Sequence, residues 1–214
     1  MLLQSIGGYM TGILDYGMGN VMAISNMIVH LGFEPRIISD PEDIRHVARV
    51  IIPGVGSFDN GMEKLANAGF TEALSTAVLH EKKPVLGICL GMQLLTSSSE
   101  EGQLPGLGWI DGETKKLAGV VGDKTYKIPH MGWNEITITR QHPLMEGLEG
   151  SRFYFTHSYA VHCRDAGDVL CTCTYGQEIT AGIGHENIFG VQFHPEKSHT
   201  FGMIILKNYI KMKT

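Results

Sequence analysis

One cysteine in this sequence lies where a thiol can act as a nucleophile. Gly87-Ile88-Cys89-Leu90-Gly91 follows the apolar run 84–86, which favours a buried strand, and it leads into residues 90–96, which we expect to form a helix. A Gly-x-Cys-x-Gly pattern between strand and helix predicts a sharp turn that exposes the cysteine at the end of a sheet. The alternative is a buried free cysteine beside a tight turn, since cysteine is among the most buried residue types.

A histidine and a glutamate near the C-terminus supply the other groups that thiol chemistry needs. His194 and Glu196 follow the apolar run 188–193, and in an extended segment side chains two residues apart point the same way. A free thiol has a pKa of about 8.5, so a base must take its proton and a carboxylate must orient that base. We predict a catalytic triad of Cys89, His194 and Glu196. The alternative is a structural or surface His-x-Glu pair.

Acyl transfer to a thiol also needs hydrogen-bond donors for the developing oxyanion. Pro53-Gly54-Val55-Gly56 follows a β-branched run, at the carboxyl edge where open α/β sheets bind ligands. We expect the Leu90 N–H and one N–H of the Gly54–Val55–Gly56 segment to be the donors, with positive potential added by the helix that begins at Leu90. Glu101 is close enough in sequence to line the same pocket. An ordinary turn at 53–56 and a solvated loop at Glu101 are the alternatives.

These groups require a sheet whose strands end at one edge. The alternation of strand and helix patterns up to residue 104 predicts an α/β fold with a doubly wound, mostly parallel sheet flanked by helices. Short β-like runs between 105 and 193 predict added antiparallel hairpins. The expected strands are 12–15, 36–38, 49–52, 84–86, 108–110, 135–138, 152–155, 159–161, 169–174 and 188–193; the expected helices are 21–31 with Asn20 as N-cap, a short one from 40–41, then 59–68, 71–81, 90–96 and 198–212.

Length and charge narrow the class of protein. A chain of 214 residues favours one domain, which we place at 11–214 after an N-terminal extension at 1–10, with Met10 a candidate natural start. The formal charge of −5 leaves no basic footprint for nucleic acid. The extension lacks the pattern of a signal peptide, and no run of 18 apolar residues exists to span a membrane.

The cysteines favour a reducing compartment. The chain has 4 cysteines and no Cys-x-x-Cys pair, and it is large enough to fold without disulfides. Cys171 and Cys173 alternate on one expected strand, where packing is favoured over metal binding because no second ligand pair has zinc spacing. We therefore expect a cytoplasmic protein without a metal ion or a cofactor.

Several motifs together carry a family resemblance. Gly-Ile-Cys-Leu-Gly-Met-Gln at 87–93 and Phe-His-Pro-Glu-Lys-Ser at 193–198 resemble the triad, or class I, glutamine amidotransferases. Within that family, the segments 15–20, 53–56, 129–134 and 157–159 are similar to one branch, whose members are separate glutaminase subunits that serve histidine biosynthesis. The resemblance covers residues 11–212, with the motifs in the family's order.

The resemblance implies a substrate, a mechanism and a partner. Cys89 would attack the side-chain amide of glutamine, and His194, oriented by Glu196, would protonate the leaving ammonia and then activate water. The Gly54–Val55 peptide would reorient to complete the oxyanion hole, and a cyclase subunit with a (β/α)8 barrel would form a heterodimer with this chain and consume the ammonia. The residues implied for glutamine binding are Gly54, Gly56, Gln93, Ser158 and Tyr159, and those implied for the partner interface are Asn20, Trp133, Asn134, Tyr154 and Lys197.

Two other functions fit parts of the pattern. A glutaminase with the same triad could feed a different acceptor, such as a nucleotide-sugar amidotransferase. A non-catalytic protein of the same fold could use the cysteine as a redox sensor, and then neither His194 nor Glu196 would be needed.

Overall fold

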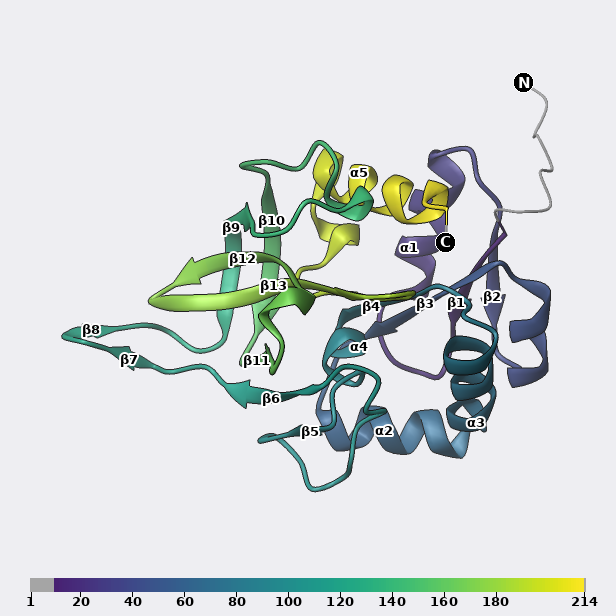
Figure 1. Ribbon diagram of the computed structural model, residues 1–214, viewed down its shortest axis with the longest axis horizontal. Helices are drawn as coiled ribbons and strands as arrows, with labels where there is room; N and C mark the ends of the chain where they lie inside the picture. Colours follow the sequence, from purple (N-terminus) through teal and green to yellow (C-terminus); the bar gives the residue numbers. More distant parts are fainter. Residues whose placement is uncertain (1–9, 214) are drawn as a thin grey trace.

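The computed structural model describes residues 10–213, and a 9-stranded mixed sheet runs through it (Figure 1). The extension expected at 1–10 lies, apart from Met10, outside the described residues. In spatial order the strands are β2 (Pro35–Ile38), β1 (Thr11–Leu14), β3 (Arg49–Gly54), β4 (Val85–Cys89), β14 (Ile188–Val191), β13 (Gln177–His185), β12 (Val169–Tyr175), β9 (His130–Ile138) and β10 (Arg152–His157).

The sheet has a parallel part and an antiparallel part. The pairs from β2 across to β14 are parallel, and the pairs from β14 across to β10 are antiparallel. The predicted α/β fold with added hairpins is confirmed. Because β3, β4 and β14 are parallel neighbours, their carboxyl ends meet at one edge, and Gly54 lies opposite Cys89 there.

Helices cover both faces of the parallel part (Figure 1). One face carries α1 (Val21–His30) and α5 (His199–Lys211), and the other carries α2 (Phe58–Asn67) and α3 (Phe70–Ser75), the latter continued by η2 (Thr76–His80). Alternate strand residues serve the two layers: Ile51 packs in the core with Ile24, whereas Ile52 packs with Leu65. No helix between residues 10 and 213 combines the length and apolar character that crossing a bilayer requires.

Smaller elements complete the fold. A 3-stranded sheet, β11-β6-β5, lies beside the main one, and β7 and β8 form a separate hairpin. The bounds are β5 (Ser98–Ser99), β6 (Gly112–Lys116), β7 (Val120–Val121), β8 (Lys124–Thr125), β11 (Tyr159–Cys163), α4 (Leu90–Gln93), η1 (Pro41–His46), η3 (Pro143–Met145), η4 (Ala166–Asp168) and η5 (Pro195–Lys197).

Several predicted boundaries are wrong for local reasons. Residues 108–110 form no strand, because the N–H groups of Trp109 and Ile110 both donate to the Leu95 carbonyl oxygen. Strand β13 was not predicted, because its glycines break the usual pattern; a Cβ on Gly182 would lie 2.8 Å from the Cys171 sulfur. Strand β9 begins at His130 rather than 135, so residues 130–134 also belong to the strand. The helix expected at 90–96 ends at Gln93, and β14 ends at Val191 rather than 193.

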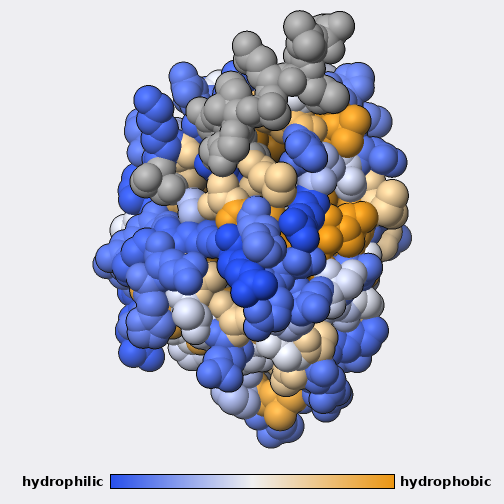
Figure 2. All heavy atoms as spheres, turned by 90° about the vertical axis from the view of Figure 1, so that its right-hand side faces the viewer, coloured by the Kyte–Doolittle hydropathy of each residue, from blue (hydrophilic) through white to orange (hydrophobic). Residues whose placement is uncertain are grey.

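The free edge at β2 has a mainly hydrophilic surface. Figure 2 shows this side, where hydrophilic side chains cover most of the area and hydrophobic ones form separate groups. On β2, Arg36 forms an ion pair with Asp43 at 2.7 Å. Charged side chains on an edge strand oppose pairing with another chain. Three of the five residues expected at the partner interface, Trp133, Asn134 and Tyr154, lie at the other end of the sheet, on β9 and β10.

The turn from β4 into α4 depends on glycines that let backbones touch. A Cβ on Gly91 would lie 1.9 Å from the Ile52 carbonyl oxygen in β3, and one on Gly87 would lie 2.5 Å from the Gly91 carbonyl oxygen. A side chain at either place would push the start of α4 away from the sheet. The position of Cys89 therefore depends on this contact between α4 and β3.

We predict that Gly91→Ala lowers the free energy of unfolding by about 3 kcal/mol, because the added methyl group meets a backbone carbonyl that has no room to move. Urea unfolding measures the effect. Gly119→Ala is the control, since the nearest atom to a Cβ there is the Tyr126 carbonyl oxygen, at 3.8 Å. Equal stability of Gly91→Ala and the unaltered chain would contradict this prediction.

Candidate active site

Cys89 has the backbone conformation of a nucleophile elbow. It is the last residue of β4, and its φ of 54° and ψ of −110° place it in a region that side-chain-bearing residues rarely occupy. Such a conformation persists only where the surrounding structure enforces it, and it is concentrated at functional sites. The contact of α4 with β3 supplies that enforcement, and it holds Cys89 at the carboxyl edge of the sheet.

His194 and Glu196 lie together in a buried pair. His194 Nδ1 is 2.7 Å from Glu196 Oε1, and the two side chains are 2% and 4% exposed. The predicted pairing is present, but the extended segment expected to produce it is not. Strand β14 ends at Val191, and the short 3-10 helix η5 turns the Glu196 carboxylate back onto the imidazole.

Strand β10 holds the His194 backbone in place. The His194 N–H donates to the Tyr154 carbonyl oxygen at 2.9 Å, and the Ser198 hydroxyl donates to the His194 carbonyl oxygen at 2.6 Å. The same Ser198 Oγ accepts the Tyr154 N–H at 3.0 Å. The imidazole is thus fixed from two sides: its main chain by β10 and its ring by Glu196.

The charges around His194 favour the imidazolium. Burial lowers the pKa of His194, but the Cys89 thiol and the Glu196 carboxylate outweigh it and raise the pKa from 6.5 to about 9. The second ring nitrogen, Nε2, is buried without a hydrogen-bond partner at ordinary distance. Since Nδ1 is occupied by Glu196, Nε2 is the nitrogen left to exchange a proton with Cys89 or a substrate.

Two other groups contact the Cys89 sulfur. Gln192 Nε2 donates to Sγ at 3.7 Å, and Sγ lies 4.0 Å from the Thr156 carbonyl oxygen in β10. Gln93 Nε2 in turn donates to Gln192 Oε1 at 3.1 Å. The helix that was expected to favour the thiolate is only four residues long. Its contribution to the local potential is correspondingly small. Of the two neighbours of the sulfur, the Gln192 amide donates to it, whereas the Thr156 carbonyl oxygen can only accept.

The expected oxyanion segment packs against the elbow. Gly54 is the register partner of Cys89, and a Cβ on it would lie 2.7 Å from the Gly91 nitrogen. Val55, the next residue, is 53% exposed, and Leu90, directly after Cys89, is buried. The segment is also held from the β1–α1 loop, where the Tyr16 hydroxyl donates to the Pro53 carbonyl oxygen at 2.7 Å. The segment expected to supply the second donor thus begins beside Cys89.

The residues expected to bind glutamine lie around this centre. Gly56 has a φ of 126° and continues the oxyanion segment. Gln93 donates to the Tyr159 carbonyl oxygen at 2.9 Å, and the Ser158 carbonyl oxygen accepts the Leu117 N–H at 2.9 Å. Glu101 reaches the start of α2, where its Oε2 accepts the Phe58 N–H at 2.8 Å. Glu101 therefore caps a helix at the rim of the site.

Three of the residues expected at a partner interface form one surface cluster. The Trp133 and Tyr154 rings are 6.2 Å apart across β9 and β10, and Lys197 Nζ lies 5.5 Å from the Tyr154 ring centroid. His199 stacks on Trp133 at 5.4 Å and was not predicted. Asn134 instead turns toward His130 and Thr174, and Asn20 caps α1 by accepting the Ala23 N–H.

Three contact residues were missed because their contacts are distant in sequence. Tyr16 lies just after the end of β1, at the same edge as Cys89, and that placement could have pointed to it. Gln192 is a lone amide in an otherwise apolar run, which is also a sign of a specific contact. His199 carries no such sign. Its φ of 47° and its stacking on Trp133 appear only in the fold.

Of the other cysteines, Cys171 and Cys173 are buried and Cys163 is half-buried. Burial raises the pKa of Cys163 and of Cys173 to about 12, and it also raises the pKa of Cys171. Thiols with such pKa values stay protonated and packed. Between residues 10 and 213, no group of three or more His, Cys, Asp or Glu side chains is arranged to hold a metal ion.

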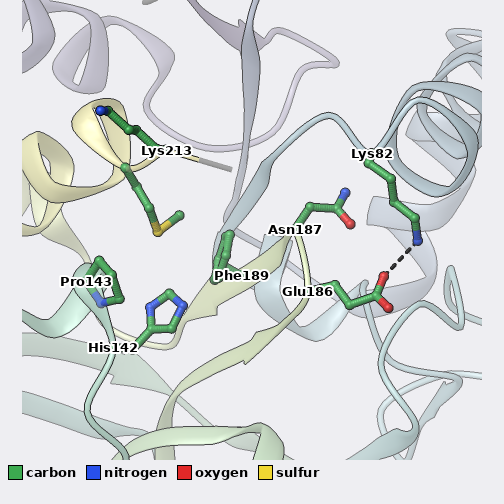
Figure 3. A pocket seen from close by; sticks show the side chains of 8 residues that line it. Lys82, His142, Pro143, Glu186, Asn187, Phe189 and Lys213 are labelled. Atoms are coloured by element: carbon green, nitrogen blue, oxygen red, sulfur yellow. Dashed lines mark hydrogen bonds and ion pairs between the residues drawn. The ribbon is translucent and has the colours of Figure 1, made fainter.

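A cavity of about 400 Å³ lies at the opposite edge of the sheet (Figure 3). Its lining includes the Lys82–Glu186 ion pair, His142 and Asn187, and Asn187 stands just before the amino end of β14. Cys89 lies at the carboxyl end of the neighbouring parallel strand β4. The lining contains no cysteine, serine or threonine, so this cavity offers no thiol or aliphatic hydroxyl nucleophile.

We predict that Glu196→Gln lowers the pKa of His194 by about one unit or more, because a neutral amide no longer favours the imidazolium. The pKa of His194 is about 9 in the folded chain, above its ordinary value of 6.5. The folding stability that protonated His194 contributes is therefore complete below pH 6.5 and is lost as the pH rises through 9. NMR titration of His194, with urea unfolding across this range, measures both effects. The exposed Glu186→Gln is the control, and an unchanged His194 titration in Glu196→Gln would contradict the prediction.

Sequence comparison places the chain among known proteins. It matches the family described as glutamine amidotransferase class-I over residues 12–212. Imidazole glycerol phosphate synthase subunit HisH 2 of Methanococcus maripaludis is 52% identical over 203 residues, which are 94% of this chain and 99% of that protein. The protein of the same name from Pseudomonas aeruginosa is 44% identical over 201 residues, 94% of this chain and 98% of its own.

Solved structures agree on the fold. A crystal structure of a glutamine amidotransferase superposes with a TM-score of 0.71 at 18% identity, covering 94% of this chain and 97% of that one. The structure of PurLQS from Thermotoga maritima gives a TM-score of 0.68 at 19% identity, covering 94% of this chain and 97% of the matched chain. With the family match over residues 12–212, these similarities show that the chain belongs to the class-I glutamine amidotransferase family.

Proposed function

We propose that this chain is the glutaminase subunit of an imidazole glycerol phosphate synthase. It hydrolyses glutamine to glutamate and ammonia at Cys89 and passes the ammonia to a cyclase subunit, which makes imidazole glycerol phosphate and an aminoimidazole carboxamide ribotide in histidine biosynthesis. The observation that carries the proposal is the elbow Cys89 beside the buried His194–Glu196 pair. The named relatives support the choice of pathway, and the buried free thiols support a reducing, cytoplasmic setting.

The first half-reaction breaks the amide bond of glutamine. The Cys89 thiolate attacks the side-chain carbonyl carbon, and a C–S bond forms as the carbonyl oxygen becomes an oxyanion. The N–H groups of Leu90 and Val55 receive that oxyanion in our proposal. The C–N bond then breaks, and His194 Nε2 gives its proton to the leaving ammonia. A γ-glutamyl thioester on Cys89 remains.

The second half-reaction releases glutamate. His194, now neutral, takes a proton from water through Nε2, and the resulting hydroxide attacks the thioester carbonyl. The C–S bond breaks, glutamate leaves, and the thiolate and the imidazolium are restored. Glu196 holds the ring in one orientation through both steps, because it occupies Nδ1 at 2.7 Å.

The partner surface is the aromatic and cationic cluster on β9, β10 and η5. Trp133 is 41% exposed, a large fraction for a tryptophan. Its register partner in β10 is Tyr154, whose carbonyl oxygen accepts the His194 N–H, so Trp133 lies on the same side of the molecule as the triad. Aromatic residues of this kind anchor protein interfaces. We propose that the barrel-shaped cyclase covers this cluster and receives ammonia directly from the site.

The function is tested by glutamine-dependent ammonia release from the complex of this chain with the cyclase and its nucleotide ligand. We predict that Cys89→Ala lowers the rate by at least ~10⁴-fold, because no other group can form the thioester. Cys163→Ala is the control, since Cys163 lies on β11 with a thiol pKa raised by burial. A Cys89→Ala complex that keeps its rate would refute Cys89 as the nucleophile, whereas an unaltered complex that releases no ammonia would refute the glutaminase assignment and favour a redox role.

The pathway assignment has a separate test. If the unaltered chain releases ammonia but neither binds the cyclase nor is stimulated by it, the glutaminase assignment stands and the histidine pathway fails. This chain would then supply ammonia to an acceptor enzyme of another kind, such as one that makes an amino sugar nucleotide.

We predict that Trp133→Ala weakens binding to the cyclase by about 30-fold, the effect of losing one buried aromatic anchor. Isothermal titration calorimetry measures the affinity. Val120→Ala is the matched control, because Val120 is 64% exposed on the separate β7–β8 hairpin. Unchanged affinity in Trp133→Ala would place the partner surface elsewhere.

A further inference from the structure

Two buried histidines near the site have no part in the mechanism above. His130 opens β9 and His157 ends β10, and the two are direct register partners across these strands. His130 Nδ1 and His157 Nε2 are 2.9 Å apart, and His157 Nδ1 is 2.8 Å from the Tyr159 carbonyl oxygen. At the outer end, Asn134 Nδ2 lies 3.3 Å from His130 Nε2. The four groups form a continuous row from β9 to the strand corner at Tyr159.

The surroundings fix both rings. His130 and His157 are 2% and 6% exposed. The His130 ring is stacked between Tyr175, at 4.1 Å, and Phe155, at 4.8 Å. Burial lowers the pKa of His130 to about 4 and that of His157 to about 3. Both imidazoles are therefore neutral at neutral pH, and each carries one N–H.

The chemistry at the two ends sets the direction of the row. The Tyr159 carbonyl oxygen can only accept, so His157 carries its proton on Nδ1 and accepts through Nε2. His130 must then donate through Nδ1, which leaves its Nε2 as an acceptor. Asn134 presents an amide N–H to that nitrogen, and its Oδ1 is already occupied by the Glu135 N–H at 2.9 Å. Every bond in the row donates inward, from Asn134 toward Tyr159.

The Tyr159 carbonyl oxygen, which ends the row, is also bound by a side chain from the helix that follows Cys89. The Tyr159 carbonyl oxygen accepts a second hydrogen bond, at 2.9 Å, from Gln93 in α4. Gln93 continues through Gln192 to the Cys89 sulfur. His157 also stands at the corner where the chain leaves the main sheet for β11 of the smaller one. The Tyr159 carbonyl thus connects the main sheet, the smaller sheet and α4 at the segment expected to hold glutamine.

We propose that His130 and His157 are positioning residues of the glutaminase site, forming a one-way hydrogen-bond relay that fixes the Ser158–Tyr159 corner relative to Cys89. The inference rests on the proposed function. It also links β9, which carries the expected partner residues Trp133 and Asn134, to the glutamine-binding corner through atoms in contact. The relay acts on substrate binding, because it holds the pocket and touches no reacting atom.

Isosteric substitutions separate the relay from simple packing. His157→Asn keeps a donor near the Nδ1 position, whereas His157→Leu keeps the bulk and loses the donor. In the complex with the cyclase and its nucleotide ligand, we expect His157→Leu to raise the KM for glutamine about tenfold with a smaller change in kcat. His157→Asn should stay within about threefold of the unaltered chain. His142→Leu is the control, since this half-buried histidine lies beside the cavity at the opposite edge.

Nitrogen-15 NMR of the histidine rings tests the direction of the relay without enzyme turnover. We expect His130 and His157 to be neutral Nδ1–H tautomers from pH 5 to 8, and Asn134→Asp, which replaces the donor with an anionic acceptor, to add a proton at His130 Nε2 while Nδ1 still donates to His157. An Nε2–H tautomer at His157, or no response of His130 to Asn134→Asp, would overturn the relay. Equal KM values for His157→Leu and the unaltered complex would overturn its positioning role. An unaltered complex that makes no ammonia would instead refute the proposed function and leave the NMR result standing.

Discussion

The contact between α4 and β3 is the constraint on which the site depends. Gly91 lies against the Ile52 carbonyl and Gly54 lies against the Gly91 nitrogen, so the elbow and the oxyanion segment are packed backbone to backbone. This packing forces Cys89 into a positive φ that its side chain would otherwise avoid. The strain at Cys89 is therefore held by glycines that surround it, and the thiol is presented at the edge where β3, β4 and β14 all end.

The mixed sheet explains how distant segments meet there. Its parallel part brings Cys89 and the proposed oxyanion segment to one edge, while its antiparallel part supplies the strand that holds the backbone of His194, the proposed base. Strand β10 binds the His194 N–H through Tyr154 and approaches the Cys89 sulfur through Thr156. The same strand pairs with β9, which carries Trp133. The surface proposed to meet a partner thus lies on this pair of strands, and β10 also contacts both His194 and Cys89.

The sequence is informative where residue type and local pattern decide the structure. The parallel strands were predictable because they are short β-branched runs between helices with clear apolar spacing, and the triad candidates were predictable because reactive side chains stand at strand ends. The antiparallel part was harder, since β13 contains glycines at 182 and 184 and β6 is largely polar. Contacts between residues distant in sequence leave little or no local sequence pattern. The contacts of Tyr16, Gln192 and His199 were therefore found only in the three-dimensional structure. The pairing of His194 with Glu196 was expected for the wrong reason, because a 3-10 turn produces it rather than an extended strand.

The central claim is that Cys89 is the nucleophile and that the other cysteines are not. Peptide mapping by mass spectrometry, after treating the complex with a glutamine analogue that carries an electrophilic group, tests it directly. The expected result is a single adduct on Cys89, with glutamine protecting against it and with Cys163, Cys171 and Cys173 unlabelled. Labelling of another cysteine, or no labelling of Cys89 with the cyclase present, would contradict it.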